Sequence, residues 1–405
     1  MSTVLADRRY APQAQSESIG LKRLWQALTI VFLAVLVTGC QTLLPKGPQR
    51  TDQTPTTQPT GPVVTPGLPS DETRHRVALL VPQSGENAGV GTSIANMATM
   101  ALLDSKSESV RITTYDTAMG AANATRKAIA DGNKLILGPL LASDVKIAAP
   151  IARAANVPLL SFSNDTAVAG NGTFLLGYVP SQSVERVVTF ARSKGYKSFA
   201  ALAPVGPYGE RALAAMRSAV KNHGGAVVAA ERYDRSAASI TGAVRRLGRV
   251  SGYDAVLIAD GGRVAVQAAP MLREEAGADI RFLGTELWNT DSSLAGAPAL
   301  RGSWFASVSD GYYGQLASKY RARYGETPFR LSALGYDAVL LTVRVSRDWK
   351  PGTTFPINRL FASDGFGGID GIFRFDNLGI AQRALEVSEV GAGGFKVVDP
   401  APTKW

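Results

Sequence analysis

The sequence predicts an α/β protein with two doubly wound, Rossmann-like lobes. Three observations support this fold class. Apolar runs of five to seven residues recur along the chain and are typical of strands buried on both faces of a parallel sheet. Segments with helical periodicity separate these runs, so that strand and helix alternate. After about residue 180 the alternation begins again and continues over a second segment of similar size.

The composition narrows the class of protein. The 405 residues are 45% hydrophobic with a net charge of +10, which excludes a chain that is disordered throughout. A single Cys cannot form an internal disulfide or a structural zinc or iron–sulfur site. With only two His, no metal site is predicted, and no cofactor is expected. Residues 74–405 carry +9, so the excess basic charge belongs to the folded part.

The amino-terminal segment has the layout of an export signal. An apolar run over 24–39, LWQALTIVFLAVLVTG, follows Lys22 and Arg23 and closes on small residues. A membrane-spanning helix needs about 20 apolar residues. A signal peptide over 1–39 is therefore favoured over the alternative of a short membrane anchor.

The end of this run resembles the lipobox of bacterial lipoproteins. Val37-Thr38-Gly39-Cys40 ends in the one Cys of the chain. The resemblance implies that Cys40 receives a diacylglycerol thioether and becomes the new amino terminus, which anchors the protein to a membrane. Gln41 then favours the outer membrane of a Gram-negative bacterium, with the protein facing the periplasm.

A tether is predicted between the anchor and the folded part, over residues 40–73. Residues 41–73 contain seven Pro, eight Thr and no aromatic residue. Such a segment cannot bury enough apolar surface to fold, and Pro favours an extended chain. The alternative, a long loop within the fold, is disfavoured next to a lipid anchor.

The elements of the two lobes follow in order. The first lobe is expected to have strands at 76–82, 110–116, 135–139 and 158–162. Its helices are expected to run through 94–102 and over 121–130 and 143–154. The second lobe is expected to have strands at 198–203, 226–230, 255–259 and 280–284. Its helices are expected at 181–194, 208–222, 239–249 and 263–276.

Several motifs resemble the type I periplasmic-binding proteins, the leucine-binding-like superfamily. The longest, VALLVPQSGENAGVGTSIANMATMALLD at 77–104, is similar more narrowly to the penicillin-binding protein activator lipoproteins. Others occur in the same order as in the family: LILGPL, VPLLSFSND, PYGERALAAM, FLGTELWN and LGYDAVLL. The resemblance covers residues 75–398. It implies a fold of two lobes joined by three crossovers, near 179, 305 and 345.

The crossovers set the expected domain boundaries. Residues 74–179 and 306–345 would form the first lobe, with helices at 312–325 and 331–346. Residues 180–305 and part of 346–398 would form the second lobe. Residues 399–405 would be a tail.

Candidate ligand contacts lie where predicted strands end, because open α/β sheets bind ligands beyond the carboxyl ends of their strands. The candidates are Ser84, Ser143, Ser161, Ser163, Asp165, Tyr208, Asp260, Glu286 and Trp288. The resemblance implies that the loops 140–143 and 161–165 hold a ligand carboxylate. It also implies that Tyr208 closes over the ligand and that Glu286 pairs with an α-amino group.

Each candidate also has a structural interpretation. Ser143 is equally consistent with a helix N-cap, and Ser161 and Ser163 with turn residues. Tyr208 is as consistent with a position outside the cleft as with one lining it. Glu286 is equally consistent with a salt bridge between the lobes, and Trp288 would bring bulk to the cleft.

The sequence does not predict an enzyme, since it contains no P-loop, G-x-S-x-G or H-E-x-x-H motif. The favoured function is a lipid-anchored regulator that activates peptidoglycan synthesis by contact with a penicillin-binding protein. The alternative is a receptor that delivers a branched-chain or related amino acid to an ABC transporter. A third hypothesis, from the charge, is contact with an anionic envelope polymer. Nucleic acid is excluded as a partner by the predicted compartment.

Overall fold

A computed structural model of the chain describes residues 73–277 and 279–405. The predicted signal peptide, the lipidation site Cys40 and the predicted tether up to residue 72 lie outside the described residues. All described residues belong to one unit of the chain. Within these ranges, no helix is both long and apolar enough to cross a lipid bilayer.

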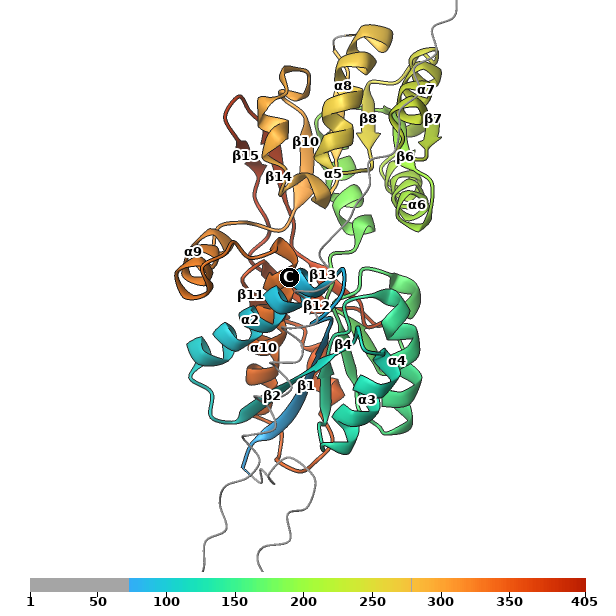
Figure 1. Ribbon diagram of the computed structural model, residues 1–405. Helices are drawn as coiled ribbons and strands as arrows, with labels where there is room; N and C mark the ends of the chain where they lie inside the picture. Colours follow the sequence, from blue (N-terminus) through green and yellow to red (C-terminus); the bar gives the residue numbers. More distant parts are fainter. Residues whose placement is uncertain (1–72, 278) are drawn as a thin grey trace, which may run out of the picture. The chain divides into compact units, whose positions relative to one another are not determined.

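The first lobe is built on five parallel strands in the order β2-β1-β3-β4-β5 (Figure 1). The strands are β1 (His75–Val81), β2 (Val110–Asp116), β3 (Leu135–Leu137), β4 (Leu159–Ser161) and β5 (Thr173–Leu175). The helices between them are α2 (Ala88–Ser105), α3 (Ala121–Ala130), α4 (Ala142–Ala154) and the short 3₁₀-helix η1 (Thr166–Val168). This part of the chain alternates strand and helix as predicted.

Successive residues of β1 are buried in two different cores. Val77 and Leu79 belong to a core that includes α2, whereas Ala78 and Leu80 belong to a core that includes α3 and α4. Side chains alternate between the two faces of a strand. Both faces of this sheet are therefore covered, which explains why the strand is apolar at almost every position.

The second lobe has seven strands in the order β15-β14-β10-β9-β8-β6-β7. The strands are β6 (Ser198–Pro204), β7 (Ala226–Tyr233), β8 (Ala255–Ile258), β9 (Arg281–Gly284), β10 (Trp304–Ser307), β14 (Glu386–Val390) and β15 (Phe395–Asp399). The helices are α5 (Pro180–Ser193), α6 (Pro207–Asn222), α7 (Ala237–Gly248) and α8 (Gly262–Ala276). Three 3₁₀-helices follow β9: η2 (Glu286–Trp288), η3 (Ser292–Gly296) and η4 (Pro298–Leu300).

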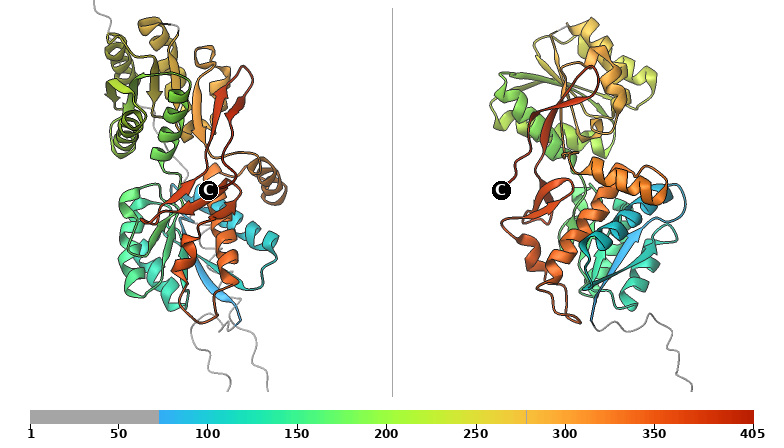
Figure 2. Two further views of the ribbon diagram at one scale, coloured as in Figure 1. Left: turned by 180° about the vertical axis from the view of Figure 1, so that it is seen from behind. Right: turned by 90° about the vertical axis from the view of Figure 1, so that its left-hand side faces the viewer.

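This second sheet is also covered on both faces, and its helices lie on either side of it in Figure 2. Leu202 of β6 belongs to the core that includes α7 and α8, whereas its neighbour Ala201 belongs to the core that includes α5 and α6. Five strands are parallel, and β14 and β15 add an antiparallel edge. The predicted α/β fold with two Rossmann-like lobes is confirmed.

The segment after residue 307 returns to the first lobe. It contains α9 (Tyr313–Tyr324), η5 (Arg330–Ser332), α10 (Ala333–Ser346), η6 (Ile357–Phe361), β11 (Phe366–Gly368), β12 (Gly371–Phe375) and β13 (Ala381–Arg383). Helices α2 and α10, far apart in sequence, pack side by side (Figure 1). The three strands form an antiparallel sheet whose Phe366, Phe373 and Phe375 join the first lobe's core.

This sheet changes two of the expected domain boundaries. Because its aromatic side chains are buried in the first lobe, the chain does not cross to the second lobe near residue 345. The third connection instead lies between Arg383, which ends β13, and Glu386, which begins β14. Asp399, expected in the tail, is the last residue of β15.

Candidate ligand-binding site

A cavity of about 480 Å³ lies among residues of both lobes. Its size falls within the range of small-molecule sites, which is about 300–1,000 Å³. The lining residues that carry the argument are Leu140, Phe162, Tyr178, Ser183, Glu286 and Arg330. Leu140, Phe162, Tyr178 and Arg330 come from the first lobe and the segment that leaves it. Ser183 and Glu286 come from the second lobe.

Most of the cavity wall is apolar. Leu140 and Leu141 precede α4, and Phe162 follows β4, so that these side chains occupy the carboxyl ends of two neighbouring strands. Leu331 of η5 and Leu385 between β13 and β14 add further aliphatic surface. Such a wall favours a ligand with an apolar body, since contact with it removes apolar surface from water.

The second lobe contributes one acid, Glu286, at the first position of η2. Its carboxyl group accepts a hydrogen bond from the Ser183 hydroxyl at 2.5 Å and another from the Tyr208 hydroxyl at 3.1 Å. The Tyr208 hydroxyl also lies 2.8 Å from Thr285 Oγ1. Burial raises the pKa of Glu286, although the bonds from Ser183 and Tyr208 oppose that rise. Among the described residues, Glu286 has no basic partner within ion-pair distance.

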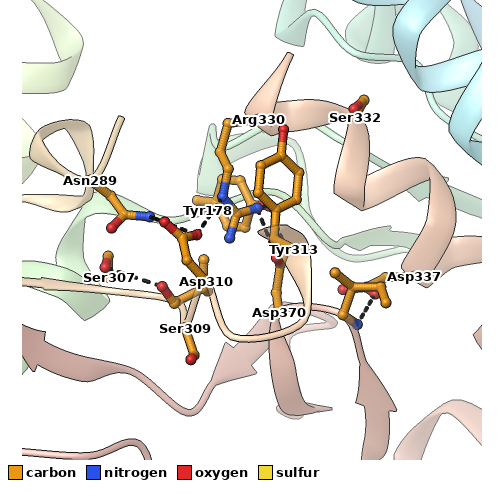
Figure 3. A network of polar contacts seen from close by, with 12 residues as sticks. Tyr178, Asn289, Ser307, Ser309, Asp310, Tyr313, Arg330, Ser332, Asp337 and Asp370 are labelled. Carbon is orange, nitrogen blue, oxygen red and sulfur yellow. Dashed lines mark hydrogen bonds and ion pairs between the residues drawn. The ribbon is translucent and has the colours of Figure 1, made fainter. Parts of the chain in front are cut away.

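The first lobe contributes Arg330, the first residue of η5 (Figure 3). Its Nη1 lies 2.8 Å from Asp370 Oδ1 and donates to the Tyr178 hydroxyl at 3.1 Å. Its Nε donates to Asp310 Oδ1 at 3.0 Å, and its guanidinium lies 4.2 Å from the ring centre of Tyr313. Burial lowers the pKa of the Arg330 guanidinium, but the interactions with Asp370, Tyr178 and Asp310 together outweigh burial and raise it.

A second guanidinium, that of Arg383, approaches the same Asp370 carboxylate as Arg330. Arg383, at the end of β13, approaches Asp337 Oδ2 at 3.5 Å and Asp370 Oδ2 at 3.8 Å. Its Nη2 donates to the Leu176 carbonyl at 2.7 Å. Asp337 and Asp370 are completely buried, and Tyr178 donates to Asp370 Oδ2 at 2.5 Å. The buried charge cluster is defined here as Arg330, Asp337, Asp370 and Arg383.

Gly368 shows how closely the cluster is packed. A Cβ added at Gly368 would lie 2.5 Å from Asp337 Oδ1, so the absence of a side chain lets the β11–β12 turn approach the carboxyl group. The backbone N–H of Ile369 then donates to Asp337 Oδ1 at 2.7 Å. Burial raises the pKa of Asp337 to about 7; the neighbouring Asp370 carboxylate adds to this effect, and Arg383 opposes it.

The serines of the 161–165 loop hydrogen-bond to their own loop and its neighbour. Ser161 Oγ donates to the Pro139 carbonyl at 2.9 Å, and Ser163 Oγ accepts from the Asp165 N–H at 3.1 Å. The Asp165 carboxylate lies 3.0 Å from Arg211 of α6, so it forms an ion pair between the lobes. None of these three candidates is among the residues lining the cavity, whereas Phe162 and Asn164 of the same loop are.

Three further candidates lie away from the cavity lining. Ser84 donates to Asp116 Oδ2 at 2.8 Å. Ser143 is exposed at the second position of α4, where Leu141, not Ser143, is the N-cap. Asp260 accepts from Tyr233 at 3.1 Å and pairs with Arg235 at 2.8 Å within the second lobe.

The expectation that Trp288 brings bulk to the cleft is wrong. Trp288 is completely buried in the second lobe's core, and its indole N–H donates to the Asp260 carbonyl at 3.0 Å. The indole packs against Gly284, where an added Cβ would lie 2.1 Å from Trp288 Cδ2. A large apolar ring gains more by filling this core than by facing a solvent-accessible cleft.

Of the predicted site residues, the structure brings Tyr208 and Glu286 together, and Glu286 lines the cavity. Sequence reasoning missed Ser183, Arg330 and Arg383. Ser183 lies inside an amphipathic helix, and the two arginines lie in short elements without periodicity. The one local feature that could have indicated Arg330 as a site residue is its charge directly beside the apolar residue Leu331.

The family is established by comparison with known proteins. A model of the periplasmic binding protein family matches residues 75–391, which includes all three connections and every strand of the two lobes except β15. The chain belongs to the periplasmic binding protein family. Membership of this family indicates a periplasmic location, and the fold agrees with the type I, leucine-binding-like fold predicted above.

Solved structures of the family share the fold. A protein named as a branched-chain amino acid ABC transporter from Rhodospirillum rubrum is 22% identical, with a TM-score of 0.70, over 80% of this chain and 100% of the other. A solute-binding protein from Rhodopseudomonas palustris BisB5, solved with 3,4-dihydroxybenzoic acid, is 18% identical, with a TM-score of 0.63, over 82% and 98%. A leucine-binding protein from Thermotoga maritima is 20% identical, with a TM-score of 0.59, over 80% and 97%.

One curated relative matches in sequence. It is an uncharacterised protein of Rickettsia prowazekii (strain Madrid E), 27% identical over 173 residues. The match covers 42% of this chain and 46% of the relative, so the chain spans less than half of that protein's length.

The buried charge cluster predicts how stability depends on pH. The native pKa of Asp337, about 7, lies above its ordinary value of 3.8, so between these values the native state holds a proton that the unfolded state has lost. The free energy of unfolding therefore falls as pH rises from about 4 to about 7, by about 1.4 kcal/mol for each unit of pKa difference. Asp337→Asn should remove this fall.

Urea unfolding at several pH values measures the slope. The exposed-acid variant Asp348→Asn, whose side chain is 55% exposed, is the control and should keep the wild-type slope. Above about pH 7, Asp337→Asn will also lower overall stability, because it removes a buried carboxylate that lies 3.5 Å from Arg383. Equal slopes in wild type and Asp337→Asn would show that Asp337 ionises normally in the native protein.

Proposed function

We propose that this protein is a non-enzymatic binding protein for a small, largely apolar solute that bears an amino group. The observation that carries the proposal is Glu286, a desolvated acid in the wall of an apolar cavity, with hydroxyl partners but no basic partner among the described residues. Several structures of similar fold are of solute-binding proteins, which supports binding over catalysis.

An ammonium group on the solute would favour the ionised form of the buried Glu286 carboxyl group. Burial disfavours the ionised carboxylate, and a nearby opposite charge restores it. The hydroxyls of Ser183 and Tyr208 already fix the carboxyl group, so little reorganisation is needed when a cation arrives. The apolar surfaces of Leu140, Phe162 and Leu331 would contact the remainder of the solute.

Thermal denaturation with matched compounds tests this function. We expect L-leucine, L-isoleucine or L-phenylalanine to raise the melting temperature by a few degrees, because a bound ligand stabilises the native state by about 2.7 kcal/mol at a hundredfold excess over Kd. The corresponding acids without an amino group, such as 4-methylpentanoate and 3-phenylpropanoate, should give a much smaller shift. Glu286→Gln should reduce binding of the amino compounds about tenfold or more.

Glu274→Gln is the matched control, since Glu274 is an exposed residue of α8. It should bind as wild type does. If none of the amino compounds shifts the transition, or if Glu286→Gln binds them normally, Glu286 is not an amine site and the proposed function fails.

A second proposed function is regulation of peptidoglycan synthesis by contact with a penicillin-binding protein. It is supported by the lipobox ending at Cys40, by the Pro- and Thr-rich segment 41–73, and by the resemblance of 77–104 to the activator lipoproteins. A lipid anchor in the outer membrane and an extended tether would let the folded part reach a synthase across the periplasm. A receptor for an ABC transporter is the alternative, and both functions are compatible with a solute in the cavity.

Crosslinking in intact envelopes distinguishes a regulator of peptidoglycan synthesis from a receptor for an ABC transporter. We expect the full-length chain to be recovered with a penicillin-binding protein from the outer-membrane fraction, and Cys40→Ser to lose both the membrane association and the crosslink, because it lacks the thiol that is acylated. The tether variant Thr57→Ser controls for changes near the anchor. Recovery of an ABC permease without a penicillin-binding protein would contradict the regulatory role and support the receptor.

A further inference from the structure

Arg330 lines the cavity, and one of its nitrogens has no hydrogen-bond partner among the described residues. Two of its nitrogens are used, Nη1 by Asp370 and Tyr178 and Nε by Asp310. Its Nη2 is buried and donates no hydrogen bond to any group among residues 73–277 and 279–405. A buried guanidinium N–H without an acceptor costs free energy. An oxygen atom placed beside Nη2 would remove that cost.

The charge around Arg330 also favours an anion. Within the buried charge cluster, the guanidiniums of Arg330 and Arg383 face the carboxyl groups of Asp337 and Asp370. Because burial raises the pKa of Asp337, these two carboxyl groups compensate the two guanidiniums incompletely near neutral pH. Asp310 supplies the remaining charge, but its side chain is 49% exposed and its interaction is screened by water.

Among the residues lining the cavity, the loops at the carboxyl ends of β3 and β4 contribute no positively charged side chain, and their one polar member is Asn164. Leu140 and Phe162 present apolar surface there. Neither Ser161 nor Ser163 lines the cavity, and the Asp165 carboxylate is paired with Arg211. An acidic group on the solute would therefore find its complement at Arg330 and not at these loops.

We infer that Arg330 is the anion anchor of the cavity and binds the carboxylate of the solute whose amino group pairs with Glu286. This inference rests on the proposed function for the amino group. Arg330 and Glu286 line one cavity from different lobes and, in the described part of the chain, form no ion pair with each other. The ligand class is a zwitterion with an apolar side chain, whose carboxylate points toward η5.

Binding of amino acids and their amides to two variants tests the role of Arg330. Isothermal titration calorimetry at pH 7 compares L-leucine with L-leucinamide and L-phenylalanine with L-phenylalaninamide. We expect the wild type to bind each acid about tenfold or more tightly than its amide, because a charge-assisted bond to a guanidinium is lost in the amide. Arg330→Gln should weaken binding of the acid by a similar factor and abolish the preference over the amide.

Asp310→Asn should raise the affinity for the amino acid, whereas Arg330→Gln should lower it. It removes a negative charge whose oxygen lies 3.0 Å from Arg330 Nε, so the carboxylate should bind about two- to fivefold more tightly while the amide is nearly unaffected. Because Asp310 is half exposed, this variant should fold even if Arg330→Gln does not. Asp348→Asn, which removes a surface charge paired with Arg359 outside the cavity lining, should leave both affinities unchanged.

The outcomes separate the two proposals. Equal binding of acid and amide by the wild type would overturn the role of Arg330 and leave the amine site at Glu286 intact. A folded Arg330→Gln that keeps the preference, or an Asp310→Asn that does not strengthen acid binding, would overturn it as well. Failure of every acid and amide to bind would overturn both proposals together.

Discussion

The buried charge cluster is the interaction on which the arrangement of this protein depends. The three connections between the lobes meet around it: Tyr178 lies in the first, Asp310 in the second, and Arg383 ends the strand that precedes the third. Each contributes a side chain to one network with Arg330, Asp337 and Asp370. Removing one partner of a buried ion pair costs about 3–5 kcal/mol because the other charge is left uncompensated, so the members of this network constrain one another.

The same network determines what the cavity can bind. Near neutral pH its carboxyl groups compensate its two guanidiniums incompletely, because burial raises the pKa of Asp337, and Arg330 Nη2 has no hydrogen-bond partner among the described residues. On the second lobe, Glu286 is held by two hydroxyls and has no cation within ion-pair distance in the described part of the chain. The two lobes therefore supply opposite charges across an apolar space, an arrangement suited to a zwitterion with an apolar side chain.

Sequence patterns predicted the fold because a strand that is buried on both faces of its sheet has a continuous apolar sequence. The run 77–81 is apolar at every position, and in the structure its alternate residues enter two different cores. The strands β11 to β13 were not predicted, because they are short and β11 contains two glycines. Their burial against the first lobe depends on tertiary contacts of Phe366 and Phe373, which local pattern does not encode.

The site was predicted only in part, for a related reason. Glu286 could be found because it follows a strand, which is a local feature. Trp288 follows the same strand, but the space above Gly284 lets its ring turn into the core. Arg330 is defined by Asp370 and Tyr178, which lie 40 and 152 positions away in sequence, and no local pattern could have identified it.

The central claim is that one solute lies between Glu286 and Arg330. A crystal structure of the protein with the amino acid that binds most tightly tests it most directly. The account predicts that the ligand's amino group lies within hydrogen-bond distance of Glu286 and its carboxylate beside Arg330 Nη2, with the side chain against Leu140 and Phe162. A ligand whose carboxylate instead lies at the loops 140–143 and 161–165, or that lies outside this cavity, would contradict it.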